Sequence, residues 1–125
     1  MFVNYNPNPV SLRVGDCTVR ALSKALDTSW EDAYVQLCAS GFLMADMPSS
    51  DLVWGALLRK AGFSRTMIPN TCPECYTVRD FCADHPTGVY VLKSEGHVAT
   101  VVDGDLYDSW NSEEKIPFYY WSKEE

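Results

Sequence analysis

The order of patterned segments along the 125 residues predicts an α+β domain, with helices first and a small antiparallel sheet after them. In the first half of the chain, apolar residues recur at helical spacing between capping residues. From residue 88 onward, β-branched and aromatic residues form short strand-like runs around an Asp-Gly turn. No repeat or low-complexity segment divides the sequence, so we expect residues 1–125 to form one domain.

The first fourteen residues, rich in Asn and Pro, predict an extended arm. Four helices are expected after it, over residues 15–26, 28–41, 49–62 and 77–84. Asp16 can cap the first helix, and Thr28 with Glu31 forms a capping box for the second. Gly41 and Gly62 close the second and third helices, and a proline follows the fourth.

An apolar stretch, residues 41–48, follows the second expected helix. We expect this loop to plug the core. The alternative is that its two methionines flank a cleft and receive an apolar substrate side chain.

Five strands are expected, over residues 63–68, 88–93, 96–102, 105–110 and 116–121. The last of these contains Pro117, which favours a place near a sheet edge. The Asp103-Gly104 pair is typical of a two-residue hairpin turn. With that turn, alternation puts Asp108 diagonal to His97 on one face of the sheet. A three-residue loop would bring Asn111 to that face instead.

Cys17 lies in the first turn of the first helix, where free N–H groups and the helix dipole favour an anion. This position lowers the pKa of a thiol, although a helix-opening cysteine can also be a small core residue. His97 and Asp108 supply a base and a group that orients it. We therefore interpret Cys17, His97 and Asp108 as a catalytic triad.

Supporting roles are expected for three further residues. Arg20, one turn after Cys17, can pair with Asp16 or another acid and stiffen the turn, or can simply be solvated. Trp110 can cover the imidazole of His97 or serve as hydrophobic packing. The backbone N–H of Cys17 is the expected oxyanion donor. Three side-chain amides of the arm are alternative donors, those of Asn4, Asn6 and Asn8.

The chain order Cys, His, Asp resembles that of the papain-like cysteine peptidases, and Asp108-Ser109-Trp110 is similar to their Asn-Ser-Trp. The segment from Asp16 to Ala21, Asp-Cys-Thr-Val-Arg-Ala, resembles the Asp-Gly-x-Cys-x-x-Arg-Ala motif of ovarian-tumour-type deubiquitinases. It also resembles compact papain-like proteins often carried by bacteria and their phages.

This resemblance implies a papain-like fold, with the nucleophile at the N-terminus of a helix that packs on the sheet. It also implies a cysteine hydrolase that cleaves an amide or peptide bond without a metal or organic cofactor. Papain-like enzymes carry an oxyanion-hole Gln six residues before the cysteine, where this chain has Ser11.

A second group of candidate ligands lies in one short stretch and consists of Cys72, Cys75, Cys82 and His85. Together they could close a tetrahedral zinc site. Such a site would suit a catalytically silent binding module of the same fold, which is the alternative function. We favour a plain loop for the CxxC, with a disulfide or redox pair as a further interpretation.

The composition limits the partners. With 17 acidic and 10 basic residues, the net charge of −7 disfavours nucleic acid and anionic membranes. No apolar run has membrane-spanning length, and the first residues do not resemble a signal peptide. Five cysteines without such a signal predict reduced thiols and a cytoplasmic location. We expect a monomer that acts on a peptide or protein substrate.

Overall fold

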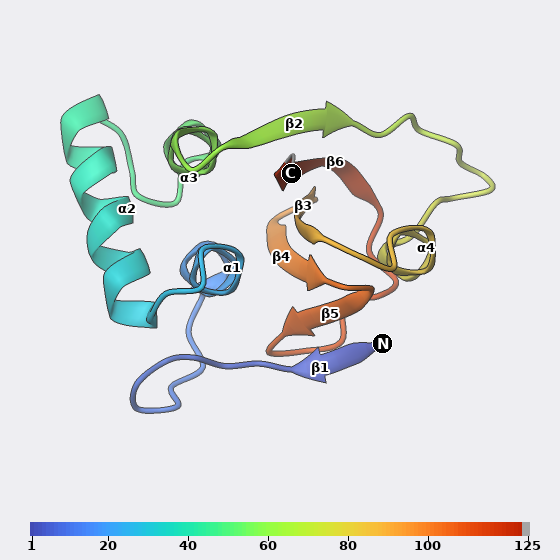
Figure 1. The fold of residues 1–125 in the computed structure, drawn as a ribbon, viewed down its shortest axis with the longest axis horizontal. Helices are drawn as coiled ribbons and strands as arrows, with labels where there is room; N and C mark the ends of the chain where they lie inside the picture. Colours follow the sequence, from blue (N-terminus) through green and yellow to red (C-terminus); the bar gives the residue numbers. More distant parts are fainter. Residues whose placement is uncertain (124–125) are drawn as a thin grey trace.

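The computed structural model describes residues 1–123 and has an α+β architecture, as the sequence predicts (Figure 1). The helices of the described chain are α1 (Cys17–Ala25), α2 (Trp30–Met44), α3 (Asp51–Lys60) and α4 (Val78–Asp84). Its strands are β1 (Phe2–Asn4), β2 (Phe63–Met67), β3 (Val89–Ser94), β4 (His97–Val102), β5 (Asp105–Asp108) and β6 (Pro117–Lys123). None of the described helices is both long and apolar enough to cross a membrane.

The strands form one sheet in the order β1-β5-β4-β3-β6-β2. All neighbouring pairs are antiparallel except β1 and β5, which run parallel. The last strand was expected near a sheet edge, and this is confirmed, because β6 is second from the edge, between β3 and the edge strand β2. Pro117 is tolerated there because it is the first residue of the strand. The arm contributes β1, which its sequence pattern did not indicate.

Helices cover the sheet from both sides. In Figure 1, α1 lies between α2 and the strands β4 and β5, and α4 lies across the sheet from it. Two apolar clusters result. The larger joins α1, α2 and α3 to the sheet and includes Leu22, Trp54, Leu58, Val91 and Trp121. The smaller lies under α4 and includes Val78, Phe81, Leu92 and Leu106.

The second helix differs from the prediction at both ends. Its N-cap is Ser29, whose hydroxyl accepts from the Asp32 backbone N–H (3.1 Å), one residue later than the predicted capping box. It continues beyond Gly41 to Met44. Gly41 serves packing there, because a Cβ at that position would lie 2.8 Å from the carbonyl oxygen of Asp46.

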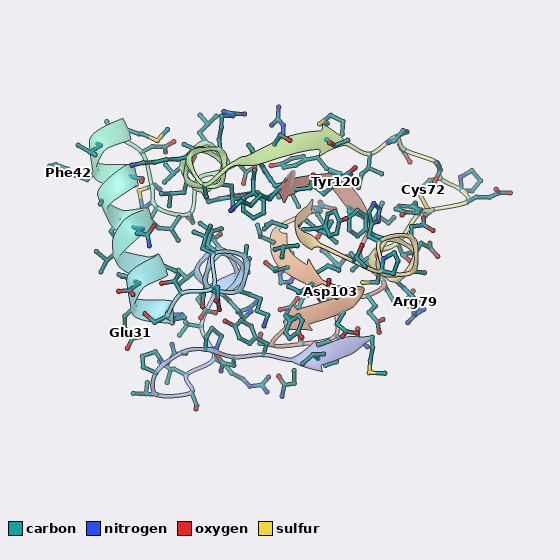
Figure 2. The ribbon with its side chains drawn as sticks, in the orientation of Figure 1. Glu31, Phe42, Cys72, Arg79, Asp103 and Tyr120 are labelled. Carbon is teal, nitrogen blue, oxygen red and sulfur yellow. A yellow bond between two sulfur atoms is a disulfide. The ribbon has the colours of Figure 1, made fainter. Side chains whose placement is uncertain are left out.

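Residues 41–48 therefore do not plug the core. The first four belong to α2, and the side chains of Phe42 and Leu43 are 84% and 82% exposed. Figure 2 shows Phe42 pointing away from the rest of the molecule. The predicted plug is wrong because apolar character alone does not tell a buried loop from an exposed helix end.

Candidate active site

The hairpin of β4 and β5 has the two-residue turn that the sequence predicts. Asp103 and Gly104 have φ values of 50° and 81°, the left-handed conformation that such a turn requires. Val102 pairs with Asp105, so the predicted register is confirmed. His97 Nε2 and Asp108 Oδ2 lie 2.6 Å apart as a consequence.

Asn111, the residue that a longer turn would have brought to the histidine, lies elsewhere. Asn111 is exposed, and its side-chain oxygen accepts a hydrogen bond from the backbone N–H of Glu113 (3.1 Å). The turn length thus decides which side chain reaches His97.

The Asp108 carboxylate is fully buried and held from several sides. Its Oδ1 accepts from Arg20 Nη2 (2.9 Å) and from the Ser109 backbone N–H (2.8 Å). Its Oδ2 accepts from the Ser112 hydroxyl (2.6 Å) in addition to facing His97. These bonds fix the carboxylate and with it the orientation of the imidazole.

Arg20 joins the two acids of the site. Its Nη1 lies 2.6 Å from Asp16 Oδ1 and its Nη2 lies 2.9 Å from Asp108 Oδ1, all three side chains being almost completely buried. The predicted pairing of Arg20 with an acid is confirmed, and it involves both. Trp30 completes the group, because its Nε1 donates to Asp16 Oδ2 (2.9 Å).

Asp16 occupies the N-cap position of α1, but the predicted capping bond is wrong. Its side chain makes no capping hydrogen bond in the part of the chain that the structure describes. Both carboxylate oxygens are engaged by Arg20 and Trp30 instead. The N–H groups of the first turn of α1 are therefore not satisfied by this carboxylate and can face an anion.

Cys17 is the half-buried first residue of α1 and faces the imidazole. Helix α1 is held against β4 by a buried bond in which the Thr100 hydroxyl donates to the Ala21 carbonyl (2.7 Å). Burial raises the pKa of the Cys17 thiol, but hydrogen bonds to His97 and to the Val98 backbone, and the charges of His97 and Arg20, outweigh burial. The pKa is lowered as a result.

The base and its acid have shifted pKa values as well. Burial lowers the pKa of His97, but the hydrogen bonds and charges of Asp108 and Cys17 outweigh it and raise the pKa above its usual value. Burial raises the pKa of Asp108, but His97, Ser112 and Arg20 outweigh it and lower the pKa. All three directions favour a thiolate, an imidazolium and a carboxylate together.

Trp110 lies against the imidazole, with ring centroids 4.8 Å apart and planes inclined by 48°. Its side chain remains 45% exposed, so it covers one side of His97 while facing solvent itself. This is the covering position that the sequence suggests for Trp110.

Two of the three arm amides, those of Asn6 and Asn8, are engaged in hydrogen bonds within the arm. Asn8 Oδ1 accepts from the backbone N–H groups of Val10 (3.0 Å) and Leu12 (3.2 Å), and Asn6 Nδ2 donates to the Leu12 carbonyl (3.4 Å). Ser11, at the position where papain-like enzymes have Gln, is exposed and has a positive φ of 56°. The free end of α1 thus remains the best placed oxyanion donor.

The four candidate zinc ligands are not assembled. Cys72 and Cys75 form a disulfide in the loop between β2 and α4, so the expectation of reduced thiols and a plain loop is wrong for this pair. His85 stacks on Phe81, with centroids 3.8 Å apart, and its Nδ1 lies 2.9 Å from the Phe81 carbonyl. Among residues 1–123, no three His, Cys, Asp or Glu side chains form a group that could hold a metal ion.

Two partners of the site were missed by sequence reasoning. Ser112 lies in a polar stretch without period, and no local pattern relates it to Asp108. Trp30 lies in α2, and its hydrogen bond to Asp16 depends on how α2 packs against α1.

No family model, curated protein or solved structure matches this chain. The functional assignment therefore rests on the chemistry of the site.

Proposed function

We propose that this chain is a papain-like cysteine hydrolase that cleaves an amide or peptide bond through an acyl-enzyme on Cys17. The observation that carries the proposal is the buried His97–Asp108 contact of 2.6 Å beside a cysteine that opens a helix. Nucleophile, base and orienting group then act as one unit.

The imidazole uses its two nitrogens differently. Since Nε2 faces Asp108, Nδ1 is the nitrogen available to Cys17 and to substrate. The Cys17 thiolate attacks the carbonyl carbon, and the oxyanion that forms is stabilised by N–H groups at the start of α1. The His97 imidazolium donates its Nδ1 proton to the leaving nitrogen as the C–N bond breaks, which leaves a thioester.

Hydrolysis of the thioester returns the site to its starting state. Neutral His97 takes a proton from water, and the resulting hydroxide attacks the thioester carbonyl. The C–S bond breaks, the carboxylic acid leaves, and Cys17 becomes a thiolate beside the imidazolium again. Each proton that His97 gives in the first half is thus recovered in the second.

The charges around the imidazole support this cycle. Asp16 and Asp108 are two carboxylates that share one guanidinium, that of Arg20. Because this buried group has an excess negative charge, it favours the protonated form of His97. Arg20 also keeps Asp108 ionised, so that the carboxylate accepts from Nε2 throughout.

Replacement of the nucleophile tests the proposal. Cys17→Ser should abolish turnover of a mixed pool of quenched fluorescent peptides, while the free energy of unfolding changes by about 1 kcal/mol or less. Cys38→Ser is the matched control, since Cys38 is also free and half-buried. Turnover that survives in Cys17→Ser, or is lost equally in both variants, would contradict the proposal.

A further inference from the structure

A cavity of about 420 Å³ opens beside the first turn of α1. Its walls come from the arm, from α1, from α2 and from the segment between α2 and α3, and no strand of the described chain contributes to them. Apolar and aromatic side chains line it on several sides, among them Leu12, Val14, Val19, Trp30, Tyr34 and Leu37. The volume lies in the range of about 300–1,000 Å³ typical of ligand pockets.

The cavity offers no unpaired charge to a ligand. Among its described lining residues, Asp16 is the one charged side chain. Its two oxygens are occupied by Arg20 Nη1 (2.6 Å) and Trp30 Nε1 (2.9 Å). A lysine or arginine side chain would therefore lose its hydration here without gaining a free carboxylate. An uncharged apolar side chain suits the walls best.

The position of the cavity relates it to the nucleophile. Gly15, Asp16 and Thr18 line it, so it begins one residue from Cys17 on either side. The cavity lies toward α2, whereas His97 lies on β4, on the other side of α1 (Figure 1). Because His97 must protonate the leaving nitrogen, the leaving group lies toward β4. The acyl part of the substrate then lies toward the cavity.

We infer that this cavity is the subsite for the substrate residue on the acyl side of the scissile bond, and that it takes a bulky apolar side chain such as Leu, Met or Phe. The inference rests on the proposed function and adds a substrate class to it. A tail that ends in glycine would leave the cavity unfilled, so such tails are poor substrates. Substrates with a bulky apolar residue at this position should therefore react with Cys17 about tenfold faster, or more, than substrates with glycine there.

Peptidyl chloromethyl ketones of equal length test this subsite, with Leu, Phe, Gly or Lys next to the reactive group. The Cys17 thiolate displaces chloride from the probe, and the adduct is measured as a mass increase at Cys17. Each rate is divided by the rate of Cys17 with iodoacetamide, which carries no peptide side chain.

Two variants of the arm sharpen the test. Val14→Asp adds a carboxylate to the wall at a residue that is 46% exposed. Val10→Asp is the matched control, since Val10 lies on the same arm, is 73% exposed and does not line the cavity. We expect the wild type and Val10→Asp to prefer Leu and Phe by about tenfold. Val14→Asp should lose this preference and gain reactivity toward Lys.

Two outcomes would overturn the inference in distinguishable ways. If Cys17 reacts rapidly with iodoacetamide but equally with all four peptide probes, the subsite is wrong and the proposed function stands. If Cys17 reacts with iodoacetamide no faster than Cys38, the proposed function fails and the subsite fails with it. If Val14→Asp and Val10→Asp change the preference among the four probes equally, the cavity is not the subsite either.

Discussion

Two regions of the molecule contain cysteine and histidine, and they differ in how folding arranges these side chains. In the first region, Cys17, His97 and Asp108 come from α1, β4 and β5. They meet only because the sheet and α1 bring distant segments together. In the second region, residues 72–85, the candidate ligands are neighbours in sequence, yet they do not form one group.

The difference shows that residue spacing alone does not make a site. In the first region, the charges are buried and paired, so that each group limits the position and protonation of the next. In the second, Cys72 and Cys75 bond to each other, Cys82 is buried in an apolar cluster, and the histidine stacks on an aromatic ring. Figure 2 shows Cys72 and Arg79 at the side of the molecule away from α2. The predictions below test this contrast.

The largest effect is expected at Asp108. Asp108→Ala should lower kcat/KM by about 10⁴-fold, because an imidazole without its acid neither holds its orientation nor keeps its proton. Asp108→Asn should be milder, because an amide oxygen can still accept from Nε2–H. Circular dichroism would check that both variants fold.

Asn111→Ala is the control for the hairpin register, because its side chain contacts the Glu113 backbone and not His97. It should leave kcat/KM unchanged. A loss in Asn111→Ala comparable to that in Asp108→Ala would contradict the role given to the register.

The next largest effect is a loss of stability on replacement of Arg20, and Arg79 is the arginine with which it is compared. Arg20→Met leaves two buried carboxylates without their guanidinium and should lower the free energy of unfolding by about 3–5 kcal/mol. Arg79 pairs with Glu113 and Glu114 in the second region, but its side chain is 58% exposed. Arg79→Met should therefore cost about 1 kcal/mol or less. Urea unfolding measures both, and equal losses would argue against a buried network at the site.

The smallest effect is expected at the disulfide. Cys75→Ser opens a loop of only a few residues, so chain entropy predicts a stability loss of about 2 kcal/mol at most. Turnover should be unchanged because this loop contributes no residue to the active site. Mass spectrometry of the intact wild-type chain, before and after reduction, would confirm the bond. A large loss of turnover in Cys75→Ser would mean that the two regions are coupled.

Those features that depend on local chemistry were predictable. The hairpin register followed from Asp103-Gly104, since the turn type fixes which residues pair. The third and fourth helices were expected from residues 49 and 77, and the caps at Ser50 and Thr77 agree with these starts to within a residue. Because His97 and Asp108 lie on either side of one short turn, their contact was predictable as well.

Features that depend on long-range packing were not predictable. The parallel pairing of β1 with β5 joins the first residues of the chain to residues 106–108, and nothing in the arm signals it. The proline of β6 indicates a place near an edge, but not that β3 and β2 are its two neighbours. Gly41 looked like a helix end, but its small size permits the close approach of the Asp46 carbonyl. Trp30 reaches the site through the packing of α2 against α1, whereas Ser112, four residues after Asp108, reaches it through the conformation of the loop after β5.

The measurement that tests the central claim most directly is the pH dependence of Cys17 alkylation, in the wild type and in His97→Asn. The claim is that the imidazole keeps Cys17 ionised. In the wild type, Cys17 should therefore be alkylated rapidly at pH values below about 8.5, the pKa of an ordinary thiol. In His97→Asn, the burial that raises the thiol pKa is no longer opposed by the imidazole, so the profile should move to higher pH. If both profiles coincide with that of a small free thiol, Cys17 and His97 are not a catalytic pair.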